Sequence, residues 1–119
     1  MALFRIDPAS DAPLFEQLAA SVRTDAAAGR LRPGDRLPGA RELAASLGVN
    51  LHTVLHAYQD LREEGLVDMR RGRGAVVTDA AETLASLHSG ILALATSARL
   101  LGLSPDAIAS LVKEAAREP

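Results

Sequence analysis

The sequence predicts a mainly α-helical fold with one small β-hairpin. Three observations predict it. Apolar residues recur at helical spacing from about residue 12 to residue 64, two short β-like segments follow before residue 79, and a heptad pattern begins after that point. We therefore expect two parts, residues 1–78 and residues 79–119.

Composition limits the class of protein. Of the 119 residues 48% are hydrophobic, but aromatic residues make up only 3%, so the core must consist mainly of Leu, Val and Ala. The absence of cysteine excludes disulfides and thiolate metal sites. The first residues lack the apolar run of a signal peptide, and the longest apolar region, "ILALATSARLLGL", is too short to span a bilayer. We expect a soluble cytoplasmic protein with no membrane partner.

Charge is distributed unevenly. The formal net charge is −2, yet residues 30–78 hold eight Arg against six acidic residues. Residues 1–29 hold two Arg against four acids, and residues 79–119 hold three basic residues against five acids. Arg70, Arg71 and Arg73 form a cluster. This local excess of positive charge favours a nucleic-acid partner, although the net charge does not.

The first predicted helix lies in "APLFEQLAASVRTDAAAGRL". Leu14, Leu18, Val22 and Ala26 follow helical spacing, and Gly29 stands where a C-terminal cap belongs. The next segment, "RPGDRLP", is typical of a turn.

Two further helices surround a glycine turn. A short helix is predicted from Ala40 to Leu47, and Gly48 follows it, where a positive φ costs glycine nothing. Asn50 is a candidate N-cap for the third helix, which should run to about Glu64 and end at Gly65.

The third helix should be amphipathic. Its predicted inward stripe consists of Leu51, Val54, Tyr58 and Leu61. The opposite, exposed side consists of His52, His56, Gln59 and Glu63. The segments "LVDMR" and "GAVVT" then form a predicted hairpin with the basic tip "RGR". Three helices followed by a hairpin is the order of a winged helix-turn-helix.

The last part of the chain is predicted to form two helices. An a/d heptad stripe extends over nearly three heptads at Leu84, Leu87, Ile91, Leu94, Ala98 and Leu101. After Gly102, the run Ser104-Pro105-Asp106 is a typical helix start. The stripe could pack on its own domain. Because a small winged helix already fills its own core, we favour packing against a second copy, which makes residues 79–119 a helical dimerisation arm.

Residues 13–78 resemble the winged helix-turn-helix of GntR-type bacterial transcription regulators. The resemblance rests on three separated motifs, "GRLRPGDRLP", "RELAASLGV" and "EGLVDMRRGRG", which occur in the order found in that family. The short remainder, together with "NLHTVLHAY" in the third helix, is similar to the YtrA-like subfamily, in which two helices serve as a dimerisation arm.

The resemblance implies a DNA-binding site. It implies that Arg41 contacts DNA from the second helix and that the start of the third helix faces the major groove, with Asn50, His52 and Thr53. It places the hairpin tip near the minor groove, with Arg71, Gly72 and Arg73.

Several positions depart from the family pattern. Leu51 and Leu55 stand where many relatives carry Arg, and His56 falls where the short subfamily often has Arg. Gly39 replaces a more usual Ser and should cap the second helix less well. No Lys or Arg lies between Arg41 and Arg62, so we expect the third helix to select sequence modestly.

Structural alternatives exist for the candidate DNA-binding residues. The arginines at 70, 71 and 73 could form an ordinary solvated tip, but the fold favours DNA contact. Arg36 and Arg41, two further candidates, could instead pair with the neighbouring acids Asp35 and Glu42.

His52 and His56 are four residues apart, yet two ligands do not make a metal site, so neither a metal nor a cofactor is predicted. We expect base or phosphate contact instead. Histidine titrates near neutrality, so operator affinity should rise as pH falls from about 8 to about 6.

The leading functional hypothesis is a homodimeric transcription regulator, expected to be a repressor, that binds a two-fold symmetric operator in double-stranded DNA. The alternative is a winged-helix module for protein interaction that binds no specific DNA. No enzyme is expected, because the sequence has no phosphate-binding glycine loop, paired nucleophile and base, or metal-ligand cluster, and His88 is isolated. Neither an operator sequence nor a site for a small-molecule effector is specified.

Overall fold

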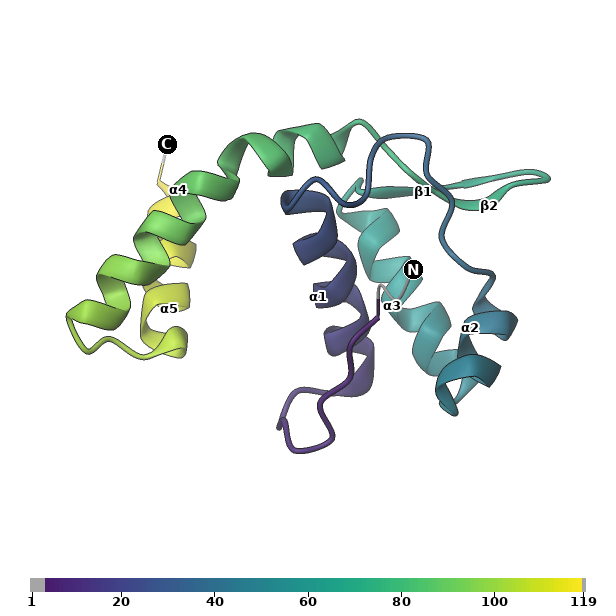
Figure 1. The fold of residues 1–119 in the computed structure, drawn as a ribbon, viewed down its shortest axis with the longest axis horizontal. Helices are drawn as coiled ribbons and strands as arrows, with labels where there is room; N and C mark the ends of the chain where they lie inside the picture. The colour runs from purple at the N-terminus through teal and green to yellow at the C-terminus, as the bar shows by residue number, and fades with distance from the viewer. Residues whose placement is uncertain (1–3, 119) are drawn as a thin grey trace. The chain divides into compact units, whose positions relative to one another are not determined.

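The computed structural model describes residues 4–118 and contains the predicted elements in the predicted order. They are α1 (Leu14–Ala27), α2 (Ala40–Leu47), α3 (Leu51–Glu63), β1 (Val67–Arg70), β2 (Gly74–Val77), α4 (Ala80–Leu100) and α5 (Pro105–Arg117) (Figure 1). The prediction of a mainly helical fold with one hairpin is confirmed. The chain divides into two compact units, Met1–Ser86 and Leu87–Pro119.

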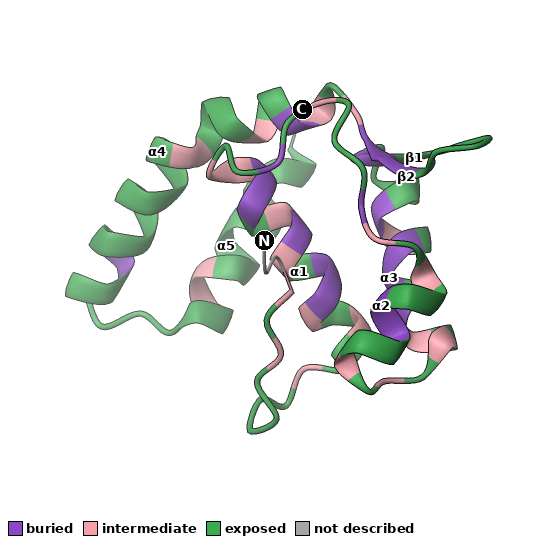
Figure 2. Ribbon diagram, turned by 45° about the vertical axis from the view of Figure 1, so that its right-hand side comes forward, coloured by how far each residue is buried: buried purple, intermediate pink, exposed green. Residues whose placement is uncertain are grey.

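The core of the first unit lies between α1 and α3. Figure 2 shows buried residues along both helices, with exposed residues on their outer sides. The buried side chains contributed by the two helices include Leu18, Val22, Ala26, Val54, Ala57 and Leu61. Burial of this apolar surface is the main force that holds the helices together.

The helical stripes differ slightly from their predicted members. Leu14 is 37% exposed, and Phe15, the next residue, packs against the core instead. On α3, Ala57 is buried and Leu51 is only half-buried. A stripe on a helix surface is wider than one row of side chains, so the spacing rule identifies the face but not every member.

The turn between α2 and α3 has the predicted geometry. Gly48 adopts a φ of +69°, in the left-handed region that glycine tolerates best. The Asn50 side chain caps α3 by accepting a hydrogen bond from the backbone N–H of His52 at 2.8 Å. Gly39 begins α2 without a side-chain cap, as expected.

The hairpin pairs β1 with β2 in antiparallel register, from Val67 opposite Val77 to Arg70 opposite Gly74. The segment before α2, predicted only as a turn, also pairs with β2. The Leu37 N–H donates to the Ala75 carbonyl at 2.9 Å, and Arg36 forms a bridge with Val76. This pairing satisfies an edge of β2 that would otherwise be open.

Two polar contacts involve α3: one connects it to the loop before α2, and the other connects its C-terminal end to α1. The Tyr58 hydroxyl donates to the Pro38 carbonyl at 2.6 Å, and burial together with the nearby Glu42 raises the pKa of Tyr58. Arg23 on α1 forms two hydrogen bonds with the Glu64 carboxylate, which raise the pKa of Arg23. Both contacts fix the position of α3.

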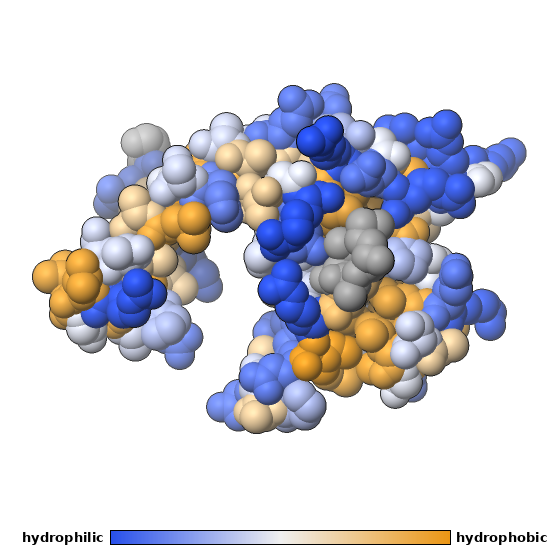
Figure 3. Space-filling model, viewed as in Figure 1, coloured by the Kyte–Doolittle hydropathy of each residue, from blue (hydrophilic) through white to orange (hydrophobic). Residues whose placement is uncertain are grey.

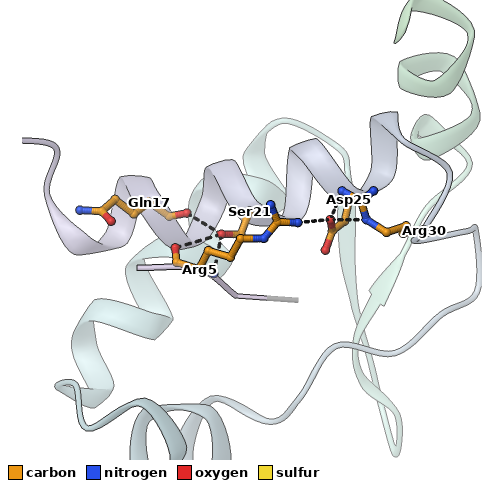
Figure 4. A network of polar contacts seen from close by, with 5 residues as sticks. All are labelled: Arg5, Gln17, Ser21, Asp25 and Arg30. Carbon is orange, nitrogen blue, oxygen red and sulfur yellow. Dashed lines mark hydrogen bonds and ion pairs between the residues drawn. The ribbon is translucent and has the colours of Figure 1, made fainter. Parts of the chain in front are cut away.

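A third polar cluster surrounds Asp25, whose side chain is 1% exposed (Figure 4). Its Oδ1 lies 2.7 Å from Arg30 Nη2 and 3.5 Å from Arg5 Nη2, while Oδ2 is buried without a hydrogen-bond partner. Ser21 Oγ accepts a hydrogen bond from the Arg5 N–H at 3.1 Å. The cluster connects α1 to the extended N-terminal segment and to the turn that follows α1.

The start of α4 belongs to the first unit. Ala81 is buried, and Leu84 packs against the core of that unit. Within residues 4–118 no helix is long and apolar enough to cross a membrane.

The second unit consists of the rest of α4 and α5. The Ser104 hydroxyl caps α5 by accepting from the Ala107 N–H at 3.1 Å, as the sequence predicts. Ala98 is buried, but many large apolar side chains of this unit are exposed: Leu87, Ile91, Leu92, Leu94, Leu100, Leu101, Leu103, Leu111 and Val112.

Candidate nucleic-acid interface

The N-terminal end of α3 presents three of the predicted site residues together. Asn50 and His52 are exposed, and Thr53 is half-buried. The side-chain Oδ1 of Asn50 accepts the capping hydrogen bond, and among residues 4–118 its side-chain NH₂ group has no acceptor, so this group can donate to a ligand. This end of the helix can therefore donate and accept hydrogen bonds toward base edges or phosphates.

Arg41 lies exposed in the first turn of α2. The predicted alternative, an ion pair with Glu42, is not formed; among residues 4–118 Arg41 has no acidic partner within 4 Å. Arg41 lines a surface hollow with Leu51 and Leu55 of α3. Its charge therefore stands beside the exposed side of α3.

Arg36 joins the hairpin rather than Asp35. Its Nε donates to the main-chain carbonyl of Arg73 at 3.1 Å, while the Asp35 carboxylate accepts from the Arg32 N–H at 2.8 Å. The structure thus brings together Arg36 and the hairpin tip, although the sequence separates them by 37 residues.

The hairpin tip is basic and exposed. Arg70, Arg71 and Arg73 are all exposed, and Gly72 adopts a φ of +80° between the last two. Only Arg70 has an acidic neighbour among the described residues, with its Nε 3.6 Å from Asp68 Oδ2. Figure 3 shows a strongly hydrophilic surface over the hairpin. Arginines at such a tip can contact phosphates or enter a minor groove.

His56 lies on the side of α3 that faces α1. Its ring stacks on Phe15 with the centroids 3.7 Å apart and the planes at 11°. Its Nε2 is 3.7 Å from Asp60 Oδ1, so a charged imidazole would pair with that carboxylate. Within residues 4–118 no three His, Asp or Glu side chains gather in a way that could hold a metal ion.

Two apolar residues of this surface are not among the predicted DNA-binding residues. Leu55 is 44% exposed and Met69 is 48% exposed, and both line one hollow bordered by the start of α2, the exposed side of α3 and the hairpin. The sequence already distinguishes Leu55, because this apolar residue belongs neither to the predicted inward stripe of α3 nor to its predicted polar face.

Comparison with known proteins decides the family. The profile described as "Bacterial regulatory proteins, gntR family" matches residues 14–77, more than half of the chain. The chain belongs to the GntR family. The resemblance inferred from its motifs is confirmed.

The similar proteins are regulators of transcription. The chain is 38% identical over 81 residues to the HTH-type transcriptional repressor YtrA of Bacillus subtilis, a match that covers 68% of this chain and 62% of that protein. It is also similar to the structure of YtrA from Sulfolobus acidocaldarius, a GntR-family transcription factor. That similarity has 37% identity and a TM-score of 0.61, and it covers 77% of this chain and 99% of the other.

A third similarity involves DNA. The DNA-binding domain of AraR, solved in complex with an operator, shares 28% identity with this chain at a TM-score of 0.54 and covers 62% of it. The first unit therefore carries the DNA-binding domain of a family of transcription regulators, which are not enzymes. This assignment favours DNA binding over the alternative of a protein-interaction module.

Proposed function

We propose that two copies of this chain bind one two-fold symmetric operator in double-stranded DNA and repress transcription. One observation carries the proposal. The start of α2, the exposed side of α3 and the hairpin border one continuous surface. Five exposed arginines on these segments and in the segment just before α2 have no ion-pair partner among residues 4–118: Arg36, Arg41, Arg62, Arg71 and Arg73.

The two ends of this surface have different proposed roles. At the end formed by α2 and the start of α3, we propose base and backbone contact in the major groove by Arg41, Asn50, His52 and Thr53. At the hairpin tip, we propose phosphate or minor-groove contact by Arg36, Arg70, Arg71, Gly72 and Arg73. His56 stacks on Phe15 of α1 and is a candidate for phosphate contact only.

Dimerisation is proposed through the arm, residues 79–119, while residues 1–78 form the DNA-binding domain. The exposed apolar side chains of α4 and α5 support it, since such an area in water is typical of an interface. Because Leu84 packs on the first unit and Ala98 is buried, the part of the heptad stripe available to a partner is Leu87, Ile91, Leu94 and Leu101.

Two-fold symmetry would compensate for the negative net charge of the chain, which opposes DNA binding. Linked DNA-binding surfaces double the number of phosphate contacts, and the second binding event becomes intramolecular. The half-sites should lie about one helical turn, roughly 34 Å, apart or a multiple of it. The repressor role is supported by the similarity to the Bacillus protein, which is named a transcriptional repressor.

The proposal is tested by selecting bound sequences from random DNA with the full chain, and by light scattering. We expect an inverted repeat and a dimer. Ile91→Glu and Leu94→Glu together should give a monomer with at least tenfold weaker operator binding. Ser89→Glu, an exposed polar position on the same helix, is the matched control and should remain dimeric. A monomeric wild-type chain, or selection without an enriched sequence, would contradict the proposal.

A further inference from the structure

The surface proposed to face DNA has an apolar strip at its centre. Leu51 and Leu55 are one turn apart on α3 and line the same hollow beside Arg41. Leu55 also lines the adjoining hollow together with Met69 of β1. Leu55 and Met69 are 44% and 48% exposed and take no part in the core of the first unit, so their exposure is not explained by folding. We name Leu51, Leu55 and Met69 the apolar strip.

The surroundings of the apolar strip are polar and mostly basic. Arg41 and Glu42 lie at one end of it, Gln59 and Arg62 lie beside the second hollow, and the basic hairpin tip is beyond Met69. Gln59 is engaged, since its Nε2 donates to Glu63 at 3.2 Å. A partner that fits must therefore present apolar groups at its centre and negative charge along its edges.

Double-stranded DNA presents this arrangement in its major groove. The 5-methyl group of thymine is the apolar group there, and phosphates line both edges of the groove. The position of Leu55, on the exposed side of α3 between Arg41 and the hairpin, places an aliphatic side chain where a base edge would approach. Glu42, in the same hollow, could accept from a cytosine amino group.

We propose that Leu55, assisted by Met69, recognises thymine 5-methyl groups and so gives this protein its preference for T·A pairs in each half-site. The inference rests on the proposed binding of operator DNA. It adds apolar contact to the base contacts proposed for Arg41 and the start of α3. Sequence selection by α3, which has no basic residue before Arg62, would then depend partly on Leu55.

The test is deoxyuridine scanning of the operator obtained by selection from random DNA. Each thymine is replaced in turn by deoxyuridine, which removes only the methyl group, and the dissociation constant is measured by fluorescence anisotropy with the full chain. Burial of one methyl group corresponds to about a fourfold change in the binding constant. We expect wild type to weaken by about fourfold at one or two thymines of each half-site.

Variants test whether the loss of affinity for deoxyuridine operators depends on the apolar strip. Leu55→Ala should bind the thymine and deoxyuridine operators equally at one of those positions. Met69→Ala should reduce the discrimination there or at a neighbouring thymine. Leu14→Ala, which truncates an exposed leucine on α1, should keep the full wild-type ratio. A second variant, Leu55→Arg, should shift the preferred base from thymine to guanine.

The possible failures are distinguishable. If random-DNA selection yields no operator, the proposed function is wrong. If an operator is found but deoxyuridine has no effect, or if Leu55→Ala keeps the wild-type ratio, DNA binding stands and the thymine assignment is overturned. An apolar strip occupied by a protein partner instead would produce the second result.

Discussion

The Nε of Arg36 donates a hydrogen bond to the main-chain carbonyl of Arg73, 3.1 Å away. The segment before α2 is thereby attached to the hairpin tip, in addition to its pairing with β2. Because the acceptor is a backbone atom, the Arg73 side chain can be removed without removing this bond. Substitution of Arg73 therefore measures its guanidinium alone.

The first prediction concerns the hairpin arginines. The double variant Arg71→Ala and Arg73→Ala should weaken operator binding and reduce the dependence of log K on log salt concentration by about 1 for each phosphate that is no longer neutralised. A dimer in which each protomer lacks both arginines should thus show a slope lower by about 4. The measurement is a salt titration of binding by fluorescence anisotropy.

Arg32→Ala is the control for this titration, because Arg32 is an exposed arginine beside the start of α4 and should leave the slope unchanged. An unaltered slope in the double variant would show that the hairpin tip does not contact phosphates.

The second prediction concerns the Tyr58–Pro38 contact. Tyr58→Phe removes the hydroxyl that donates to the Pro38 carbonyl at 2.6 Å and should lower the free energy of unfolding by about 1 kcal/mol. Urea unfolding at a fixed chain concentration measures it, with an unchanged m-value expected. Gln59→Ala, at the next and exposed position, should change stability by less than about 0.5 kcal/mol. Equal midpoints for Tyr58→Phe and wild type would contradict the prediction.

The third prediction concerns the buried carboxylate of Asp25. Arg30→Ala removes the nearer of its two charged partners and leaves a group 1% exposed with only Arg5, at 3.5 Å. The expected loss of stability is about 1.5–3 kcal/mol, since hydrogen bonds to charged groups are worth about that much. Arg32→Ala again serves as the exposed control in thermal or urea unfolding. A variant at position 30 as stable as the control would show that Asp25 needs no partner there.

The fourth prediction is the pH dependence of operator binding. An imidazole that gains a proton gains attraction for phosphates, so affinity should rise from about pH 8 to about pH 6. His52 is exposed at the start of α3, whereas a charged His56 would pair with Asp60, 3.7 Å away. His52→Ala should therefore remove most of the dependence and His56→Ala less of it.

His88→Ala, on α4, is the matched control for the histidine variants and should keep the wild-type pH profile. An affinity that is flat across this pH range in wild type, or unaltered in the double variant at positions 52 and 56, would refute the prediction.

Local patterns in the sequence were sufficient to place the elements. Ala40 and Leu47 bound α2 as predicted, Asn50 caps α3, Ser104 caps α5, and Gly48 occupies the left-handed conformation at the turn. These features depend on residues within a few positions of one another, so short-range hydrogen bonding and φ preferences decide them. The family motifs added the order of the winged helix.

The geometry of the candidate site was predictable in part. The basic hairpin tip and the exposed start of α3 follow from periodicity and charge. The stacking of His56 on Phe15 does not follow from periodicity. Helical spacing does not distinguish one exposed position of α3 from another, whereas α1 lies beside only some of these positions. The exposure of Leu55 and Met69 on one surface likewise requires the hairpin and α3 to be placed together.

The helices, the hairpin, the apolar faces and the family follow from patterns along the amino-acid sequence. The contacts between distant residues become visible only in the folded chain: Arg36 with the Arg73 carbonyl, Tyr58 with Pro38, Asp25 with Arg5, and the start of α4 with the core of the first unit. Local propensities act over only a few residues. Contacts between distant residues depend instead on how the helices and strands pack against one another in the core, and local sequence patterns do not specify this packing.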